Sequence, residues 1–249
     1  MKNIDDLIFE KVQLLAPRSE PASHHVDKKV LILSTDRTGS NFFCDVLART
    51  GLCGQPQEWF KTDFFNAYLK ISGNEKASFQ DYLKSLLLNT TSPNGVFSVK
   101  VHIRQMVELE SRGFNVLDLN FDHVVYLYRK NKVDQAVSFA KALKTGQWVA
   151  DIKGSDGSKT VANFEISEAL NTILKMQNIY EEKYMNVVAD EYFYEDFTDK
   201  KNTKVFQRFF SLIGLDFSDI KIKSGLKKQS DSKSKRLSYQ FMKYISNSK

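Results

Sequence analysis

The sequence has little cysteine, histidine and proline, and it lacks long apolar runs. Two cysteines, Cys44 and Cys53, are too few for a disulfide framework, and four scattered histidines do not complete a zinc site with them. We therefore expect free thiols, a reducing compartment and a cytoplasmic protein. Apolar runs such as residues 30–33 are far shorter than the ~20 residues that span a bilayer, so no membrane span is expected. Residues 1–20 carry four acidic side chains where a secretory leader has a basic start, so no targeting segment is expected.

The chain has 249 residues, of which 42% are hydrophobic, and this is enough for a substantial core. It has no internal repeat and no low-complexity linker, which favours a single domain over 1–249, with a helix and linker at 1–27. The net charge is +6, but residues 220–249 hold nine basic residues and one acidic residue. This basic segment indicates either an anionic partner (a phosphorylated small molecule, a nucleic acid or an acidic surface) or a solvated tail.

Apolar strands alternate with amphipathic helices along the chain. Strands are predicted at 28–34, 95–103, 123–128 and 191–194, and helices at 1–16, 42–50, 132–144, 164–187 and 202–213. This alternation predicts an α/β fold with a mostly parallel central sheet flanked by helices. Ligands of such sheets bind at the carboxyl ends of the strands.

The loop 34–41, Ser-Thr-Asp-Arg-Thr-Gly-Ser-Asn, joins the first strand to the first helix. Its backbone N–H groups and the helix N-terminus point at one spot, and Arg37 and the hydroxyls of Thr38 and Ser40 add donors for an oxyanion. The loop lacks the spacing and terminal lysine of a nucleotide-triphosphate P-loop and is not a dinucleotide-binding glycine motif. The alternative is an ordinary tight turn capped by Ser40 or Asn41.

A second cationic position follows the strand 123–128. Arg129 ends this strand, and Ser138 lies in the helix that follows, so a guanidinium and a hydroxyl would share one phosphate. The alternative is a strand-end arginine followed by a surface helix.

Several motifs together are more specific than either segment alone. They are Arg-Thr-Gly-Ser-Asn at 37–41, Gly-Leu-Cys-Gly-Gln-Pro-Gln-Glu-Trp-Phe at 51–60, the stretch from Tyr128 to Ser138 with Thr-Gly-Gln-Trp at 145–148, Tyr-Glu-Asp-Phe at 194–197 and Gln-Ser-Asp at 229–231. In order and spacing, from about residue 28 to 240, the chain resembles the bacterial sulfotransferases that sulfate trehalose and related carbohydrates. The resemblance implies a P-loop-like three-layer fold and 3′-phosphoadenosine 5′-phosphosulfate (PAPS) as co-substrate, with no metal. Relatives also suggest a homodimer.

The resemblance also assigns roles in donor binding. Residues 37–41 would hold the 5′-phosphosulfate, Arg129 with Ser138 the 3′-phosphate, and Tyr194 the adenosine. The residues expected to bind the donor are Arg37, Thr38, Gly39, Ser40, Asn41, Arg129, Ser138, Tyr194, Lys227 and Lys228. We expect Lys227 and Lys228 on a loop that closes over the donor. The later basic residues, such as Lys235 and Arg236, are predicted on the exposed face of a terminal helix that packs through Leu237, Phe241, Tyr244 and Ile245.

Sulfuryl transfer needs stabilisation of charge on the transferring group and a base for the acceptor hydroxyl. The resemblance places the base on Glu58, with Arg37 and Lys100 as further catalytic residues, and His102 is a second candidate base. Residues 55–90 are the expected acceptor-facing segment, with Gln57, Glu58, Trp59 and Trp148 as acceptor-binding residues. The alternative is a surface glutamate beside core aromatic residues.

Two positions stay open. Lys100 within a predicted strand either reaches the sulfuryl oxygens or, on an edge strand, blocks aggregation. Asp36 and Asn41 stand where the family commonly has proline and threonine. Asp36 either points away, paired with Arg37 or Lys100, or it weakens donor binding.

The leading hypothesis is a sulfotransferase acting on a trehalose-like sugar, a glycolipid or a glycan precursor. One alternative is a nucleotide or sugar kinase-like phosphotransferase, which lacks support because the Walker lysine and a magnesium carboxylate are missing. The other is a non-catalytic anion or nucleic-acid binder, which rests on the basic tail alone.

Overall fold

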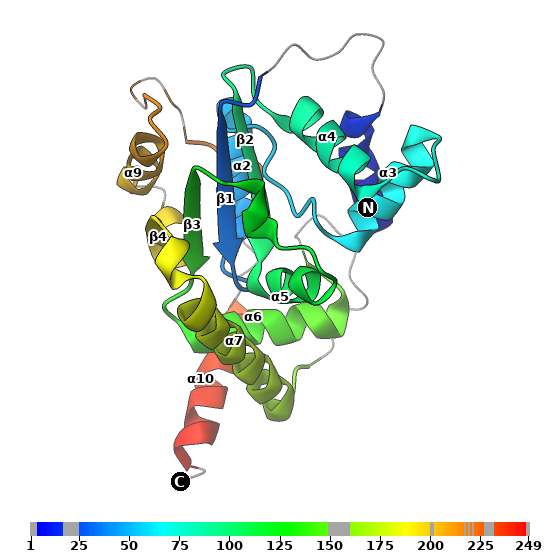
Figure 1. Ribbon diagram of the computed structural model, residues 1–249. Helices are drawn as coiled ribbons and strands as arrows, with labels where there is room; N and C mark the ends of the chain where they lie inside the picture. Colours follow the sequence, from blue (N-terminus) through cyan, green and yellow to red (C-terminus); the bar gives the residue numbers. More distant parts are fainter. Residues whose placement is uncertain are drawn as a thin grey trace.

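The computed structural model describes residues 4–16, 25–148, 160–199, 202–216, 218, 220, 222–226 and 232–247. At its centre is a parallel sheet with strand order β2-β1-β3-β4 (Figure 1). The strands are β1 (Lys28–Ser34), β2 (Val96–His102), β3 (His123–Tyr128) and β4 (Asp190–Phe193). All four predicted strands and the α/β fold class are confirmed.

Helices cover both faces of the sheet. The α-helices are α1 (Ile4–Val12), α2 (Ser40–Thr50), α3 (Thr62–Ser72), α4 (Phe79–Thr90), α5 (Ile103–Ser111), α6 (Lys132–Thr145), α7 (Asn163–Lys183), α8 (Tyr194–Phe197), α9 (Lys204–Leu212) and α10 (Ser232–Asn247). Short 3₁₀ turns lie at η1 (Gln13–Leu15), η2 (Val116–Leu119) and η3 (Met185–Val187). The predicted helices are confirmed to within a few residues, except that the helix expected over 164–187 ends at Lys183.

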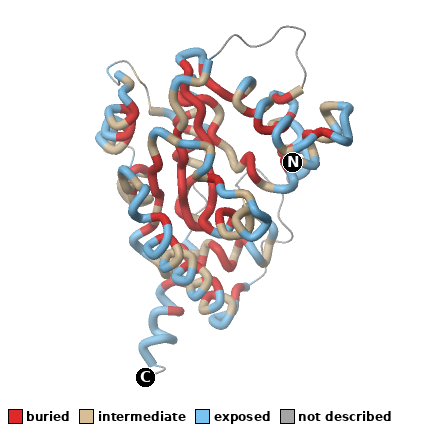
Figure 2. The backbone as a smooth tube through the Cα atoms, in the orientation of Figure 1, coloured by how far each residue is buried: buried red, intermediate tan, exposed pale blue. Residues whose placement is uncertain are grey.

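Successive side chains of each strand point to opposite faces of the sheet, and the helices on these faces give the fold three layers. In β1, Leu31 and Leu33 pack into a core with α1, α3, α4, α5 and α7, whereas Val30 and Ile32 pack on the other side against α2, α8 and α9. The buried residues accordingly concentrate along the strands (Figure 2). Both faces of the sheet are covered, which is why its strands are continuous apolar runs.

Residues 55–90 form more core than expected. This segment was predicted to face the acceptor, but most of its aromatic side chains pack in the core shared by α1, α3 and α4. Trp59 is fully buried, its Nε1 donates to the Gln55 carbonyl at 2.7 Å, and the Tyr82 hydroxyl donates to the Trp59 carbonyl at 2.7 Å. Trp59 is therefore a core residue that pins the loop around Glu58, and its predicted role in acceptor binding is wrong.

The terminal helix α10 packs on α6 and α7 through the part that ends near Phe241. Phe241 is buried and Leu237 is partly buried in this contact. Tyr244 and Ile245, which were predicted to pack inward, are 48% and 37% exposed, because the last turns of α10 project beyond the helices that cover the rest of it (Figure 1).

The two cysteines are buried and unpaired, and burial raises the pKa of each thiol to about 12. Among the helices that the structure describes, none is long and apolar enough to cross a membrane.

Candidate active site

The loop between β1 and α2 has an unusual backbone. Arg37 has φ +63° and Gly39 has φ +76°, both in the left-handed region. Gly39 also lies against Tyr194, since a Cβ at this position would be 2.5 Å from a ring carbon of that tyrosine. This conformation is uncommon for arginine, and it brings the loop backbone close to the carboxyl end of β4.

Contacts from α6 and the segment after it hold this loop in place. Arg37 Nε donates to Ser138 Oγ at 3.0 Å, and Arg37 Nη1 donates to the Trp148 carbonyl at 2.6 Å. Gln135 Nε2 donates to Thr35 Oγ1 at 3.0 Å and to the Asp36 carbonyl at 2.6 Å. Ser138 was predicted to act with Arg129, but its hydrogen bond goes to Arg37.

Two polar side chains of the loop differ from expectation. Asp36 pairs with neither Arg37 nor Lys100 but faces Arg104, with 3.6 Å between Asp36 Oδ1 and Arg104 Nη2. The Thr38 hydroxyl is fully buried and donates to the Thr35 carbonyl at 3.1 Å, so it closes the loop internally and is not an anion donor.

Arg129 follows β3 and is nearly buried. Its guanidinium lies 4.4 Å from the centre of the Tyr194 ring, 3.5 Å from Asp134 Oδ2 and 3.9 Å from Glu195 Oε1. Its Nε is buried and donates no hydrogen bond to any of the residues that the structure describes. A buried guanidinium with an unused donor is suited to an oxyanion.

Glu195, in the motif at 194–197, has a structural role. Its carboxylate accepts hydrogen bonds from the backbone N–H groups of Lys130 at 3.0 Å and Asn131 at 3.1 Å. This clamps the turn that follows Arg129 to α8, and it fixes Tyr194 beneath the Arg129 guanidinium.

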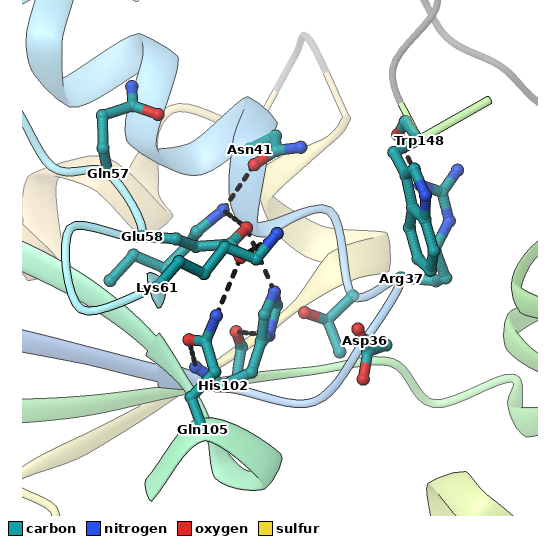
Figure 3. A network of polar contacts seen from close by, with 12 residues as sticks. Asp36, Arg37, Asn41, Gln57, Glu58, Lys61, His102, Gln105 and Trp148 are labelled. Atoms are coloured by element: carbon teal, nitrogen blue, oxygen red, sulfur yellow. Dashed lines mark hydrogen bonds and ion pairs between the residues drawn. The ribbon is translucent and has the colours of Figure 1, made fainter. Parts of the chain in front are cut away.

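Glu58 is the centre of a network of polar contacts (Figure 3). Its Oε1 lies 2.8 Å from Lys100 Nζ and 3.4 Å from His102 Nε2. Its Oε2 accepts from Gln105 Nε2 at 3.0 Å and lies 3.2 Å from Lys61 Nζ. Burial raises the pKa of Glu58, but Lys100, His102 and Lys61 outweigh it and hold the pKa well below its usual range. The carboxylate is therefore ionised at neutral pH.

Lys100 points toward α2. Its side chain is 1% exposed, and Nζ donates to Asn41 Oδ1 as well as contacting Glu58. Although β2 is at an edge of the described sheet, the lysine does not face solvent, so the interpretation as an aggregation-blocking edge residue is wrong. His102, two residues later, lies with Nδ1 2.8 Å from Ser34 Oγ.

A cleft of about 1230 Å³ brings these groups together. Of the residues named from the sequence, it is lined by Asp36, Arg37, Gly39, Ser40, Asn41, Gln57, Glu58, His102, Arg129, Ser138, Trp148 and Tyr194. Thr38, Trp59 and Lys100 lie behind the surface of the cleft. Lys227 and Lys228 lie outside the described residues. In the close-up, Arg37 and Trp148 lie apart from the network around Glu58 (Figure 3). One end of the cleft therefore carries the Arg37 guanidinium, and the other carries the Glu58 carboxylate.

Six basic residues that were not predicted for the site also line the cleft: Lys11, Lys61, Arg104, Lys141, Lys223 and Lys235. Lys235 lies on an exposed face of the terminal helix, as predicted, but it also lines the cleft, which was not predicted. Nothing in the local sequence distinguishes these lysines from surface lysines, because tertiary packing alone brings them to the cleft. In the described part of the chain, no three His, Cys, Asp or Glu side chains gather as a metal site.

Comparison with known proteins identifies the family. A model of the family described as Stf0 sulphotransferase matches residues 29–243. No curated protein matches the chain in sequence.

Three sulfotransferase structures are among those similar to this chain. Mouse sulfotransferase SULT7A1 complexed with PAP is 13% identical, with 94% of this chain and 69% of that chain covered and a TM-score of 0.43. The sulfotransferase domain from the curacin biosynthetic pathway is 13% identical, with coverages of 88% and 98% and a TM-score of 0.48. The sulfotransferase domain of the Synechococcus olefin synthase is 13% identical, with coverages of 91% and 98% and a TM-score of 0.47.

Proposed function

The chain belongs to the Stf0 sulfotransferase family, and we propose that it transfers a sulfuryl group from PAPS to a hydroxyl of a carbohydrate acceptor. Family membership supports sulfuryl transfer over the kinase and nucleic-acid-binding alternatives. The observation that carries the proposal is the content of one cleft. A carboxylate held ionised by Lys100 lines the same cleft as two arginines, the partly buried Arg37 and the buried Arg129.

The donor fits the end of the cleft lined by Arg37 and Arg129. The start of α2 directs backbone N–H groups toward this end, where they would bind the 5′-phosphosulfate together with Arg37. Arg129 would bind the 3′-phosphate, which supplies the acceptor that its buried Nε lacks. Tyr194 beneath Arg129 offers an aromatic surface beside the same phosphate. Ser138 lies at the same end of the cleft, because its Oγ accepts a hydrogen bond from Arg37 Nε.

Glu58 is the proposed base at the other end of the cleft. The acceptor oxygen bonds to sulfur as the bond between sulfur and the phosphate oxygen breaks, and the acceptor proton passes to Glu58. The products are a sulfate ester and adenosine 3′,5′-bisphosphate (PAP). Its low pKa makes Glu58 a weak base while Lys100 is bound to it. When Lys100 turns to the negative oxygens of the sulfuryl group, Glu58 loses its closest cation and gains proton affinity.

Calorimetric titration of an Arg129→Ala variant tests the donor assignment. PAP affinity should fall about ten- to a hundred-fold, the size of one charge-assisted contact, whereas adenosine 5′-phosphate, which lacks the 3′-phosphate, should lose little. Lys130→Ala is the matched control, because this neighbouring lysine is exposed and does not line the cleft. Equal losses for both nucleotides in Arg129→Ala would remove Arg129 from the 3′-phosphate site.

A further inference from the structure

The N-terminal helix α1 is part of the cleft although it precedes the region matched by the family model, which begins at residue 29. Leu7, Ile8 and Lys11 of this helix line the cleft. Ile8 and Val12 are buried in the core that α1 shares with α3 and α4, which fixes the helix over the loop that carries Glu58. What α1 adds to the site is therefore additional to the part of the chain that the family model matches.

Lys11 places a positive charge on the part of the cleft formed by α1, and no negatively charged side chain in the described residues pairs with it. Its Nζ donates to the amide oxygen of Gln57 at 2.5 Å, and it forms no ion pair with any residue in the described ranges. An amide is a weak partner for a buried ammonium. Glu58, whose charge acts favourably on Lys11, uses its two oxygens for Lys100, Lys61 and Gln105.

The surrounding charges increase this imbalance. The groups that act on Lys11 are Lys100 of β2, Glu58 of the neighbouring loop, and Cys44 and Asp45 of α2. Burial and the like charge of Lys100 outweigh the favourable effect of Glu58 and Asp45 and lower the pKa of Lys11 to about 8. An anion beside Lys11 would reverse both unfavourable effects.

We propose that Lys11, with Gln57, binds an anionic group of the acceptor, a carboxylate or a phosphate, and that the enzyme therefore prefers acidic sugars to neutral ones. This inference rests on the proposed sulfotransferase function and names the acceptor class. Lys11 is in this view a specificity-determining residue on the side of the cleft where Glu58 takes the acceptor proton.

The test compares acceptors that differ in one anionic group. With PAPS as donor, kcat/KM is measured for glucose, glucuronate and glucose 6-phosphate, and for trehalose and trehalose 6-phosphate. We expect the acidic member of at least one pair to exceed its neutral counterpart about ten- to a hundred-fold, as one charge-assisted contact would give. Lys11→Gln should abolish that ratio and Lys11→Arg should keep it. Lys70→Gln is the control, because Lys70 of α3 is exposed and does not line the cleft.

The pH dependence separates binding from a merely structural contact to Gln57. In the wild type, kcat/KM for the acidic acceptor should fall as pH rises through about 8, because Lys11 then loses its charge. Lys11→Arg should shift this fall to higher pH, and kcat/KM for neutral acceptors should not show it. A lysine that only fastens α1 would affect both acceptor types alike.

Three results would overturn the proposal: neutral sugars turned over as well as acidic ones, an acidic preference that survives in Lys11→Gln, or no turnover of any acidic sugar by a protein that binds PAP. Absence of PAP binding is a different failure. It would strike the proposed function itself, because PAP binding does not depend on Lys11.

Discussion

The ion pair between Glu58 and Lys100 couples catalysis to stability. Lys100 is buried, and Glu58 supplies its only carboxylate contact within the described residues. Removing one member of a buried pair leaves an uncompensated charge, whereas removing both is far less costly. A loss of activity on mutation of Glu58 therefore has two sources, loss of the base and disturbance of Lys100, and they need to be separated.

Glu58→Gln should lower kcat about 10²–10⁴-fold while PAP affinity stays nearly unchanged, because glutamine keeps the shape but cannot take the proton. The same variant should lose about 3 kcal/mol of unfolding free energy in urea titrations, because Lys100 then has only neutral acceptors, Asn41 and the introduced amide, and no compensating negative charge. Glu58→Gln combined with Lys100→Met should recover most of that stability without recovering kcat. Turnover above a tenth of the wild type would place the base elsewhere, with His102 the next residue to test.

The turn between β1 and α2 requires glycine at position 39 for two reasons, and any single substitution of Gly39 affects both at once. Its φ of +76° is strained for any other residue, and a Cβ would collide with the Tyr194 ring. Gly73, after α3, has φ +66° but nothing within 4 Å of the corresponding Cβ position. Gly73 therefore reproduces the backbone strain without the collision.

Gly39→Ala should weaken PAP binding more than about tenfold in calorimetric titrations. The added Cβ forces the Tyr194 ring to move, and the ring then loses its contact with the Arg129 guanidinium. Gly73→Ala should lower stability by roughly 1 kcal/mol and leave PAP affinity unchanged. If the two variants lose PAP affinity equally, the collision with Tyr194 has no part in donor binding.

The strands, the helices next to them and the position of Gln57 and Glu58 in the site were predictable, whereas the core packing of most of residues 55–90 and the part played by α1 were not. A strand buried on both faces is a continuous apolar run, and Val30 to Leu33 shows this directly in sequence. Trp59 has no such local signal, since an aromatic residue beside a polar loop suits a sugar site as well as a core. Lys11 reaches the cleft only because Ile8 and Val12 bury α1 against distant helices. The family resemblance pointed to Arg37, Arg129 and Glu58, and all three line the cleft, but the partners they contact were not predicted.

The segment that contains α10 is the most basic part of the chain, and two of its lysines, Lys223 and Lys235, line the cleft. Residues 220–249 hold nine of the 36 basic residues and one of the 30 acidic residues. The Ser238 hydroxyl donates to Asp134 Oδ1 at 2.6 Å, and Lys141 Nζ donates to Ser234 Oγ at 2.9 Å, so α6 holds the start of α10 against the site. The start of α10 is therefore part of the wall of the cleft and brings the positive charge of Lys235 to it.

Two adjacent cations of α10 distinguish a local role from a diffuse one. Lys235 lines the cleft and Arg236 does not, although both are exposed. The donor carries several negative charges, and at physiological salt the screening length is about 8 Å, so a cation on the cleft wall acts on it far more than one facing away. Lys235→Gln should raise the donor KM about two- to five-fold at low salt and flatten its dependence on ionic strength. Arg236→Gln should change neither, and equal effects of both variants in steady-state kinetics over a salt series would show that the tail attracts the donor as a diffuse positive surface.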